Sequence, residues 1–245
     1  MQQPQRHDIA RAGFVETGGG KRAYYAVPAG DGPFPGVLVF QEAFGVNRYV
    51  QSEVHRLAEH GYAAIAPDLF DGATFSYDDR ESIFPRLSVL TDNGMLEHVN
   101  PAVAFLDAQP QVKKGPYGAV GFCMGGRLAV AVAAELGEKI AAAAAFYGGG
   151  IAPEEQRFFT PLLDRLADVK GELLLIYGGE DASIAPKEHA RIAETLSSLK
   201  KTYTLTVYPG AQHGFASRDR TSVYDAEAAE NAWDQTLALF DRTLK

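Results

Sequence analysis

The run AVGFCMGG, residues 119–126, contains Cys123, the only cysteine of the chain. Apolar residues suited to a strand lead into it, one glycine lies two residues before the cysteine, and two more glycines follow closely. The alanine-rich stretch after the run suits a helix. A strand, a sharp turn and a helix in this order hold a nucleophile, usually a serine, at the tip of the turn. The structural alternative is a small buried side chain, because free cysteine is among the most buried residue types.

The stretches around this run alternate between strand-like and helix-like patterns. This alternation predicts an α/β fold with a mostly parallel central sheet and helices on both of its faces. The predicted strands are 22–27, 36–40, 62–66, 117–122, 140–147, 172–177 and 202–208, and the predicted helices are 48–60, 124–136, 186–199 and 224–243. No repeat or linker divides the chain, so residues 1–245 are expected to form one domain. Residues 68–94 look irregular, and we expect them to form part of a substrate pocket or a partial lid.

The composition is that of a globular protein and excludes several classes of partner. Hydrophobic residues make up 46% of the 245 residues, and the net charge of −8 argues against binding to nucleic acid. One cysteine cannot form an intrachain disulfide, residues 1–11 lack a signal-peptide pattern, and no apolar run is long enough to span a bilayer. We therefore expect a soluble, cytoplasmic protein that binds neither nucleic acid nor membranes.

A nucleophilic thiol needs a base, and the base needs an acidic residue to orient it. In α/β-hydrolases these groups follow the nucleophile in the order acid, then histidine, on loops after later strands. Asp181 and the adjacent Glu180 come directly after the predicted strand 172–177, and His213 comes after the last predicted strand. None of the other five histidines combines this order with such a loop. Taken singly, an aspartate here suits a helix cap and a histidine in a glycine-rich loop suits a solvated side chain; order and placement together favour a catalytic triad.

The run FQEAFGVN, residues 40–47, follows another predicted strand. This loop is where an α/β-hydrolase places one N–H of its oxyanion hole, and the residue after the nucleophile supplies the other. Those donors would be Ala43 and Met124. Glu42 is unexpected beside them, because a carboxylate would repel the developing charge unless it were protonated, turned away or paired with the thiol. A glutamate that faces solvent is the simpler alternative.

Together these segments resemble the dienelactone hydrolase family (carboxymethylenebutenolidases), which has the α/β-hydrolase fold. The similarity rests on QEAFGVN at 41–47, PDLF at 67–70, GFCMGG at 121–126, Asp181, and HGF at 213–215. The resemblance implies a Cys123–His213–Asp181 triad, with Asp181 rather than Glu180 as the acid. It also implies that Glu42 interacts with the resting thiol and helps to form the thiolate when substrate binds.

The same resemblance bears on substrate binding. Members that act on dienelactones hold the substrate carboxylate with arginines, one shortly after the catalytic histidine and one before the cysteine turn. Arg218 is the candidate after the histidine, and Arg86 and Arg80 are candidates in the irregular segment. Most exposed arginines are simply solvated. Tyr147 resembles a pocket tyrosine of the family, with a core aromatic as the alternative.

The function expected from the resemblance is hydrolysis of small lactones or esters of the dienelactone type through a cysteine acyl-enzyme. The histidines and the cysteine show no metal-ligand spacing, so we expect neither a metal nor an organic cofactor. The expected partner is a small ester or lactone, and the expected assembly is a monomer or a small homo-oligomer. Two alternatives stay open: a carboxylesterase or thioesterase of broader specificity with the same triad, and a non-catalytic ligand-binding or thiol-sensing protein.

Overall fold

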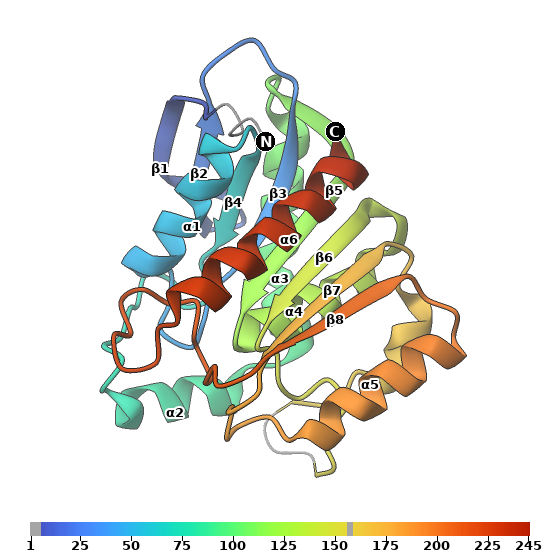
Figure 1. The fold of residues 1–245 in the computed structure, drawn as a ribbon. Coiled ribbons are helices and arrows are strands. Elements are labelled where there is room, and N and C mark those ends of the chain that lie inside the picture. Colours follow the sequence, from blue (N-terminus) through green and yellow to red (C-terminus); the bar gives the residue numbers. More distant parts are fainter. Residues whose placement is uncertain (1–5, 156–158) are drawn as a thin grey trace.

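The computed structural model describes residues 6–155 and 159–245, without the side chain of Arg80. Its centre is one eight-stranded sheet with the order β1-β2-β4-β3-β5-β6-β7-β8 (Figure 1). The pairs β1–β2 and β2–β4 are antiparallel and the other neighbours are parallel. The strands are β1 (Ile9–Gly18), β2 (Lys21–Pro28), β3 (Phe34–Phe40), β4 (Ala63–Pro67), β5 (Val112–Phe122), β6 (Ile140–Phe146), β7 (Glu172–Gly178) and β8 (Tyr203–Tyr208).

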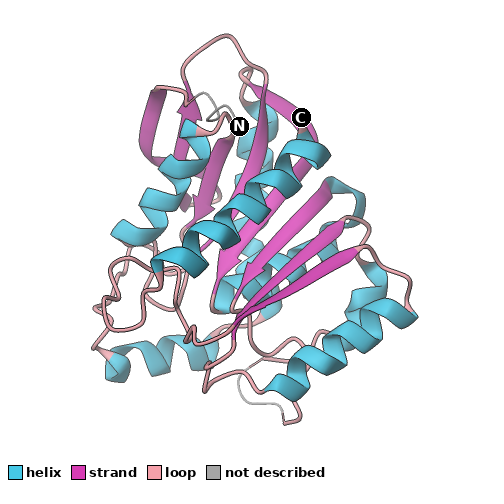
Figure 2. Cartoon of the chain, in the orientation of Figure 1, coloured by secondary structure: helices cyan, strands magenta, loops and turns pink. Residues whose placement is uncertain are grey.

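Helices cover both faces of this sheet (Figure 2). One face carries α1 and α6, and the other carries α3 and α4, with α5 beside the short helix η2 (Figure 1). The helices are α1 (Arg48–Glu59), α2 (Arg80–Val89), α3 (Asp92–Ala108), α4 (Met124–Leu136), η1 (Gly137–Lys139), η2 (Leu163–Asp168), α5 (Pro186–Ser198) and α6 (Ala226–Leu244). The predicted α/β architecture with a mostly parallel sheet is confirmed.

The core lies where the central strands are covered on both faces. Strands buried in this way are apolar along most of their length, because neither face meets water. Strand β6 has the sequence IAAAAAF, and all but the first of its alanines are buried between α4 and α6. Alanine favours helices in isolation. Its small side chain here lets a helix approach the sheet closely on each side, so tertiary packing decides for the strand.

Residues 68–94 are more regular than the sequence analysis predicts. Helix α2 occupies residues 80–89, and the side chain of Asp79 caps its start by accepting a hydrogen bond of 3.1 Å from the N–H of Ser82. Helix α3 begins at Asp92, and the hydroxyl of Thr91 accepts from the N–H of Gly94 at 3.1 Å. The prediction of an irregular segment was therefore wrong for these residues. Its polar residues are helix caps, and a proline inside α2 hides the helical pattern.

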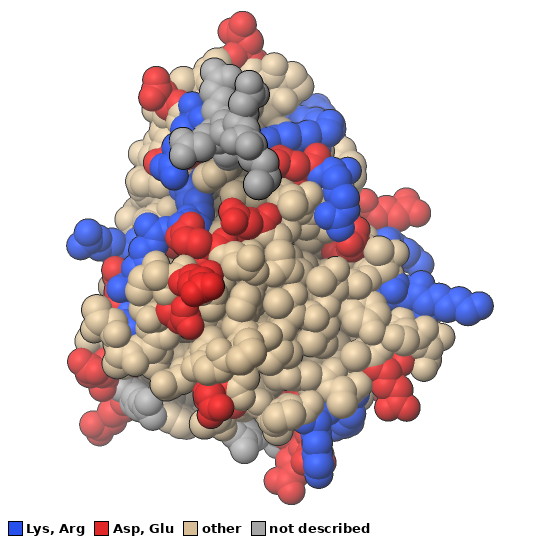
Figure 3. Space-filling model, in the orientation of Figure 1, with Lys and Arg blue, Asp and Glu red and all other residues tan. Residues whose placement is uncertain are grey.

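Charged side chains are unevenly distributed over the surface. Figure 3 shows acidic and basic groups side by side over the junction of α1 and α6, whereas a broad area to their right is uncharged. Within the described ranges, no helix is both long enough and apolar enough to cross a membrane. The edge strand β1 was not predicted, because its exposed polar residues dilute the apolar signal.

Candidate active site

Cys123 forms the tip of the turn between β5 and α4, in a strained backbone conformation. Its φ of 56° and ψ of −119° are rare for any residue with a side chain. Such a conformation costs about 1–3 kcal/mol and persists only where the surroundings hold it. A Cβ on Gly121 would overlap the carbonyl oxygen of Gly125, and a Cβ on Gly125 would overlap that of Phe40. The two glycines are therefore required by close packing of the backbone around the turn.

His213 and Asp181 meet Cys123 at the carboxyl ends of the parallel strands. His213 follows β8, and its Nε2 lies 3.1 Å from the sulfur of Cys123. Its Nδ1 lies 2.7 Å from Oδ2 of Asp181, a buried residue that follows β7. The other oxygen of Asp181 accepts a hydrogen bond of 2.8 Å from the N–H of Ser183, which fixes the carboxylate. Glu180, the alternative acid, is exposed.

The surroundings of His213 favour its protonated form. Burial lowers its pKa, but the negative charge of the Cys123 sulfur and the hydrogen bond with Asp181 raise it more, to about 10. Nδ1–H donates to the carboxylate, so Nε2 is the nitrogen that exchanges a proton with the sulfur. The geometry can therefore move the thiol proton to the imidazole and hold the resulting ion pair.

Glu42 lies beside this pair and is fully buried. Neither of its carboxylate oxygens has a hydrogen-bond partner among the described residues. Burial raises the pKa of Glu42 to about 6, against the opposing influence of Arg220, His213, Tyr147 and Tyr77. Glu42 therefore does not face solvent, as one reading of the sequence allowed. Its side chain changes charge near pH 6.

The contact between Glu42 and the thiol that the family resemblance implies is not seen. The hydrogen bond that the structure gives the Cys123 sulfur is to His213. Glu42 instead acts electrostatically on the His213 side of the pair. The arrangement corresponds to a thiol engaged with its base.

The two predicted oxyanion-hole residues lie beside Cys123 in the same cavity. Ala43 follows β3, Met124 begins α4, and both line the same cavity as Cys123. The loop that carries Ala43 is fixed by Gln41, whose buried side-chain oxygen accepts from the N–H of Leu69 at 3.1 Å. Backbone N–H groups that point at the attacked carbonyl group can hold its developing oxyanion.

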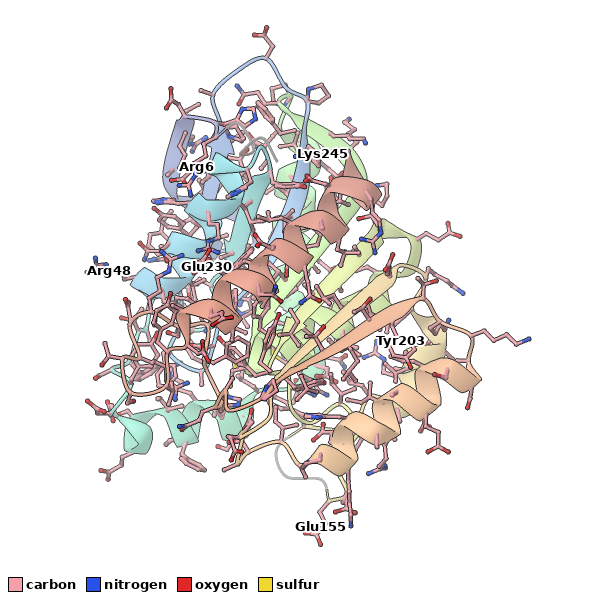
Figure 4. The ribbon with its side chains drawn as sticks, viewed as in Figure 1. Arg6, Arg48, Glu155, Tyr203, Glu230 and Lys245 are labelled. Carbon is pink, nitrogen blue, oxygen red and sulfur yellow. The ribbon has the colours of Figure 1, made fainter. Side chains whose placement is uncertain are left out.

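The cavity over these groups has a volume of about 550 Å³, a size that suits a small organic ligand. Its rim includes Glu155, which extends outward at the bottom of Figure 4. The lining residues are Ala43, Leu87, Cys123, Met124, Gly149, Gly150, Pro153, Glu154, Glu155, Phe159, Ala182, Ser183, Ile184, Ala185, Glu188 and His213. Apolar groups make up more of this lining than polar groups.

Two buried ionic side chains brace one wall of this cavity. Arg127 pairs with both oxygens of Asp92, at 2.6 and 3.1 Å, and donates to the carbonyl oxygen of Thr160 at 2.6 Å. Glu188 accepts from the N–H groups of residues 151 and 152, at 2.8 and 3.0 Å. The wall is therefore tied both to the helix that carries the cysteine turn and to α5.

Two of the three arginines predicted to bind a substrate carboxylate, Arg218 and Arg86, do not line this cavity. Arg218 is half exposed and lies 4.0 Å from Glu53 and 3.9 Å from Glu230, between α1 and α6. Arg86 is exposed on the last turn of α2, one residue before the cavity-lining Leu87. The side chain of Arg80 lies outside the described part of the structure.

Tyr147 and Arg220 do lie close to the triad. The ring of Tyr147 meets that of His213 edge-on at 5.2 Å, and the tyrosine is fully buried. Arg220, which the sequence analysis did not select, packs against Gly214, stacks over the ring of Tyr77 and acts on Glu42. The sequence could have pointed to Arg220 only through its position in the loop after His213, and Arg218 lies in the same loop.

The described residues contain no group of three or more histidine, cysteine, aspartate or glutamate side chains arranged to hold a metal ion. The arrangement that they do contain is a thiol, a base and an orienting acid at one cavity, which Ala43 and Met124 also line. Such a site can carry out acyl transfer through a covalent intermediate.

Comparison with known proteins identifies relatives over almost the whole chain. The model of the dienelactone hydrolase family matches residues 22–244. A protein of Synechocystis sp. described as a "putative carboxymethylenebutenolidase" is 33% identical over 228 residues, which cover 91% of this chain and 92% of the relative. A Bradyrhizobium protein described as a "probable 2-oxo-3-(5-oxofuran-2-ylidene)propanoate lactonase" is 30% identical over 227 residues, covering 91% and 90%.

Solved structures agree with these sequence matches. The crystal structure of a "putative dienelactone hydrolase" from Klebsiella pneumoniae superposes with a TM-score of 0.83 at 31% identity, covering 91% of this chain and 93% of that one. An α/β-hydrolase from a deep-sea metagenome library superposes with a TM-score of 0.72 at 17% identity, covering 98% of both chains. The α/β-hydrolase fold is thereby confirmed.

Proposed function

The chain belongs to the dienelactone hydrolase family of hydrolases, and from this premise we propose that it cleaves small lactones or esters through an acyl-enzyme on Cys123. Two contacts carry the proposal: the Cys123 sulfur lies 3.1 Å from Nε2 of His213, and Nδ1 of His213 lies 2.7 Å from Asp181. Cys123 lines a cavity large enough for a small organic ligand.

In the first half-reaction the thiol proton moves to Nε2 of His213, and the thiolate attacks the carbonyl carbon of the bound ester. The carbonyl oxygen becomes an oxyanion that accepts hydrogen bonds from the N–H groups of Met124 and Ala43. As the tetrahedral intermediate collapses, the carbon–oxygen bond of the ester breaks. The leaving alkoxide takes the proton from His213, and the acyl group stays on Cys123 as a thioester.

In the second half-reaction His213 removes a proton from water, and the resulting hydroxide attacks the thioester carbon. The same two N–H groups hold the new oxyanion. Breakage of the carbon–sulfur bond releases the carboxylic acid, and the proton on His213 returns to the sulfur. Asp181 keeps the imidazole in one tautomer throughout, as the short contact to Nδ1 requires.

Glu42 contributes an adjustable charge to this cycle. While ionised, it stabilises the protonated His213, and Arg220 offsets the cost of burying its charge. A nearby negative charge also opposes the developing oxyanion, so the protonated form of Glu42 suits the attack step. We assign Glu42 a role in setting the protonation of the Cys123–His213 pair.

The second candidate function is a carboxylesterase or thioesterase of broader specificity, and the positions of the arginines favour it. Arg218 is engaged with Glu53 and Glu230, and no arginine or lysine side chain among the described residues lines the cavity. A neutral ester needs no cation to hold it. The triad and the chemical steps are the same for both functions.

A hydrolysis screen separates the candidates, with dienelactones set against simple neutral acyl esters and Cys123→Ala as the blank. Either substrate profile supports the proposed hydrolase, and the ratio of kcat/KM between carboxylate-bearing and neutral substrates assigns the specificity. Equal hydrolysis by Cys123→Ala and the unsubstituted enzyme, at one enzyme concentration, would rule out the mechanism. A protein that binds ligands without turnover and forms no acyl-enzyme would be the non-catalytic alternative.

A further inference from the structure

A run of buried polar side chains extends from the active site along the buried face of α1. Its members are Glu42, Tyr147, Tyr49 and Glu53, each at most 1% exposed. None of these carboxylate oxygens and phenol hydroxyls makes a hydrogen bond of ordinary length and angle with the described residues. Glu53 is paired with Arg56 instead, and Tyr147 interacts with both Glu42 and Tyr49. Four buried polar groups whose mutual interactions replace ordinary hydrogen bonds need an explanation beyond packing.

The four side chains form a connected series. Tyr147 follows β6, meets the ring of His213 at 5.2 Å, and interacts electrostatically with both Glu42 and Tyr49. Tyr49 is on α1, and Glu53 follows it by one helical turn, so the two share the buried face of that helix. Each step of the series therefore joins neighbours in a space that excludes water.

The outer end of the series is a charged cluster at the junction of α1 and α6. Glu53 lies 3.4 Å from Nε of Arg56 and 4.0 Å from Arg218, and both arginines contact Glu230, at 2.7 and 3.9 Å. Glu230 is labelled at this junction in Figure 4. Asp219 completes the charged groups that act on Glu53. At the inner end, Arg220, His213, Tyr147 and Tyr77 act on Glu42.

We propose that Glu53 is a positioning residue for the thiol reaction, coupled to Glu42 through the phenols of Tyr49 and Tyr147. The inference rests on the role proposed above for Glu42. It gives the charged cluster between α1 and α6 an influence on the protonation state of the active site.

The coupling follows from what a phenol can do. A hydroxyl has one proton to donate, so Tyr49 can stabilise a charge on Glu53 or assist Tyr147, but not both at once. When Glu53 is neutral, both phenol dipoles are free to favour an ionised Glu42. When Glu53 is ionised, Tyr49 turns toward it and Glu42 loses that support. Two like charges in one buried region add to this opposition.

Both carboxyl groups change charge near neutral pH, as the coupling requires. Burial raises the pKa of Glu53 to about 7, against the opposing influence of Arg56 and Arg218. Burial raises the pKa of Glu42 to about 6. Ionisation of one carboxyl group can therefore change the pKa of the other between about pH 6 and pH 7.

The test is a direct titration of Glu53 by NMR of protein labelled with ¹³C at the glutamate carboxyl groups. The Glu53 signal is identified by its loss in Glu53→Gln. Glu42 is already largely ionised where Glu53 titrates, so in Glu42→Gln we expect the Glu53 midpoint to fall by about half a pH unit. In a Tyr49→Phe background, Glu42→Gln should produce no further shift, because the connection is already broken. Glu59→Gln, a partly exposed glutamate of the same helix that pairs with Arg6, is the matched control and should leave the midpoint unchanged.

A functional readout accompanies the titration. Cys123 is the only cysteine, so the pH profile of its alkylation by iodoacetamide should change above about pH 7 in Glu53→Gln, where Glu53 is ionised in the unsubstituted protein. A purely structural role would not produce this change. Arg218→Gln weakens the ionised form of Glu53 from the surface and should change the profile in the same way, even if Glu53→Gln fails to fold. A Glu53 midpoint that stays unchanged in folded Glu42→Gln would overturn the inference. Hydrolysis that survives Cys123→Ala would instead refute the proposed function, and the titration would still decide the coupling.

Discussion

Replacement of Glu42 by glutamine tests the electrostatics of the site quantitatively. The folded-state pKa of Glu42 is raised from the usual 4.5 to about 6 because the side chain is buried. The fold therefore favours the neutral acid, and this contribution to stability is fully present below pH 4.5 and is lost as the pH rises through about 6. A difference between 4.5 and about 6 corresponds to about 2 kcal/mol.

Glutamine resembles the neutral acid at every pH. Relative to the unsubstituted protein, Glu42→Gln should thus gain about 2 kcal/mol of unfolding free energy between pH 4.5 and pH 8. The measurement is urea unfolding across this range, followed by the fluorescence of Trp233, the only tryptophan, which is buried against α1. Glu59→Gln, at a partly exposed position, is the control.

The same variant should lose an inflection near pH 6 in the alkylation rate of Cys123. Parallel stability curves for Glu42→Gln and the unsubstituted protein, with identical alkylation profiles, would refute the reasoning. Glu42 would then be removed from the mechanism.

Three further substitutions test the geometry. Asp181→Asn should lower kcat about a hundredfold or more with little change in stability, because it presents the wrong tautomer of His213 to the sulfur; steady-state kinetics and urea unfolding measure the two effects. Gly125→Ala should destabilise the protein by about 3 kcal/mol or more, or prevent folding, because the added Cβ overlaps the carbonyl oxygen of Phe40; soluble yield and thermal unfolding report it. Arg127→Met should cost about 3 kcal/mol by leaving a carboxylate without its partner, seen as a lower Tm, and an unchanged Tm would contradict the bracing role.

The parts of the site that depend on local sequence were predictable. The turn at Cys123 follows from its flanking glycines, and the positions of Asp181 and His213 follow from the ends of predicted strands. These features need only neighbouring residues and the rule that the carboxyl ends of parallel strands converge. Helix α1 was likewise predicted, and its apolar face gave no sign that Glu53 is buried with it. That burial depends on Arg56 and on the packing of α6.

The choice between Arg218 and Arg220 could not be made from sequence. Consecutive turns follow His213, with the N–H of Ser217 bonded to the carbonyl oxygen of Gly214 and the N–H of Arg220 bonded to that of Ser217. These turns send Arg218 toward α1 and α6 and return Arg220 to the active site. Spacing along the chain places both arginines at similar distances from the histidine, and only the folded loop separates them.

The acyl-enzyme on Cys123 is tested most directly by trapping it. The enzyme is mixed with an activated ester, quenched in acid within the first turnovers, and digested for mass spectrometry. The account predicts that the peptide containing Cys123 gains the mass of the acyl group, and that His213→Ala forms this adduct much more slowly. Full turnover without any adduct on that peptide, or an adduct on another residue that persists in Cys123→Ala, would contradict it.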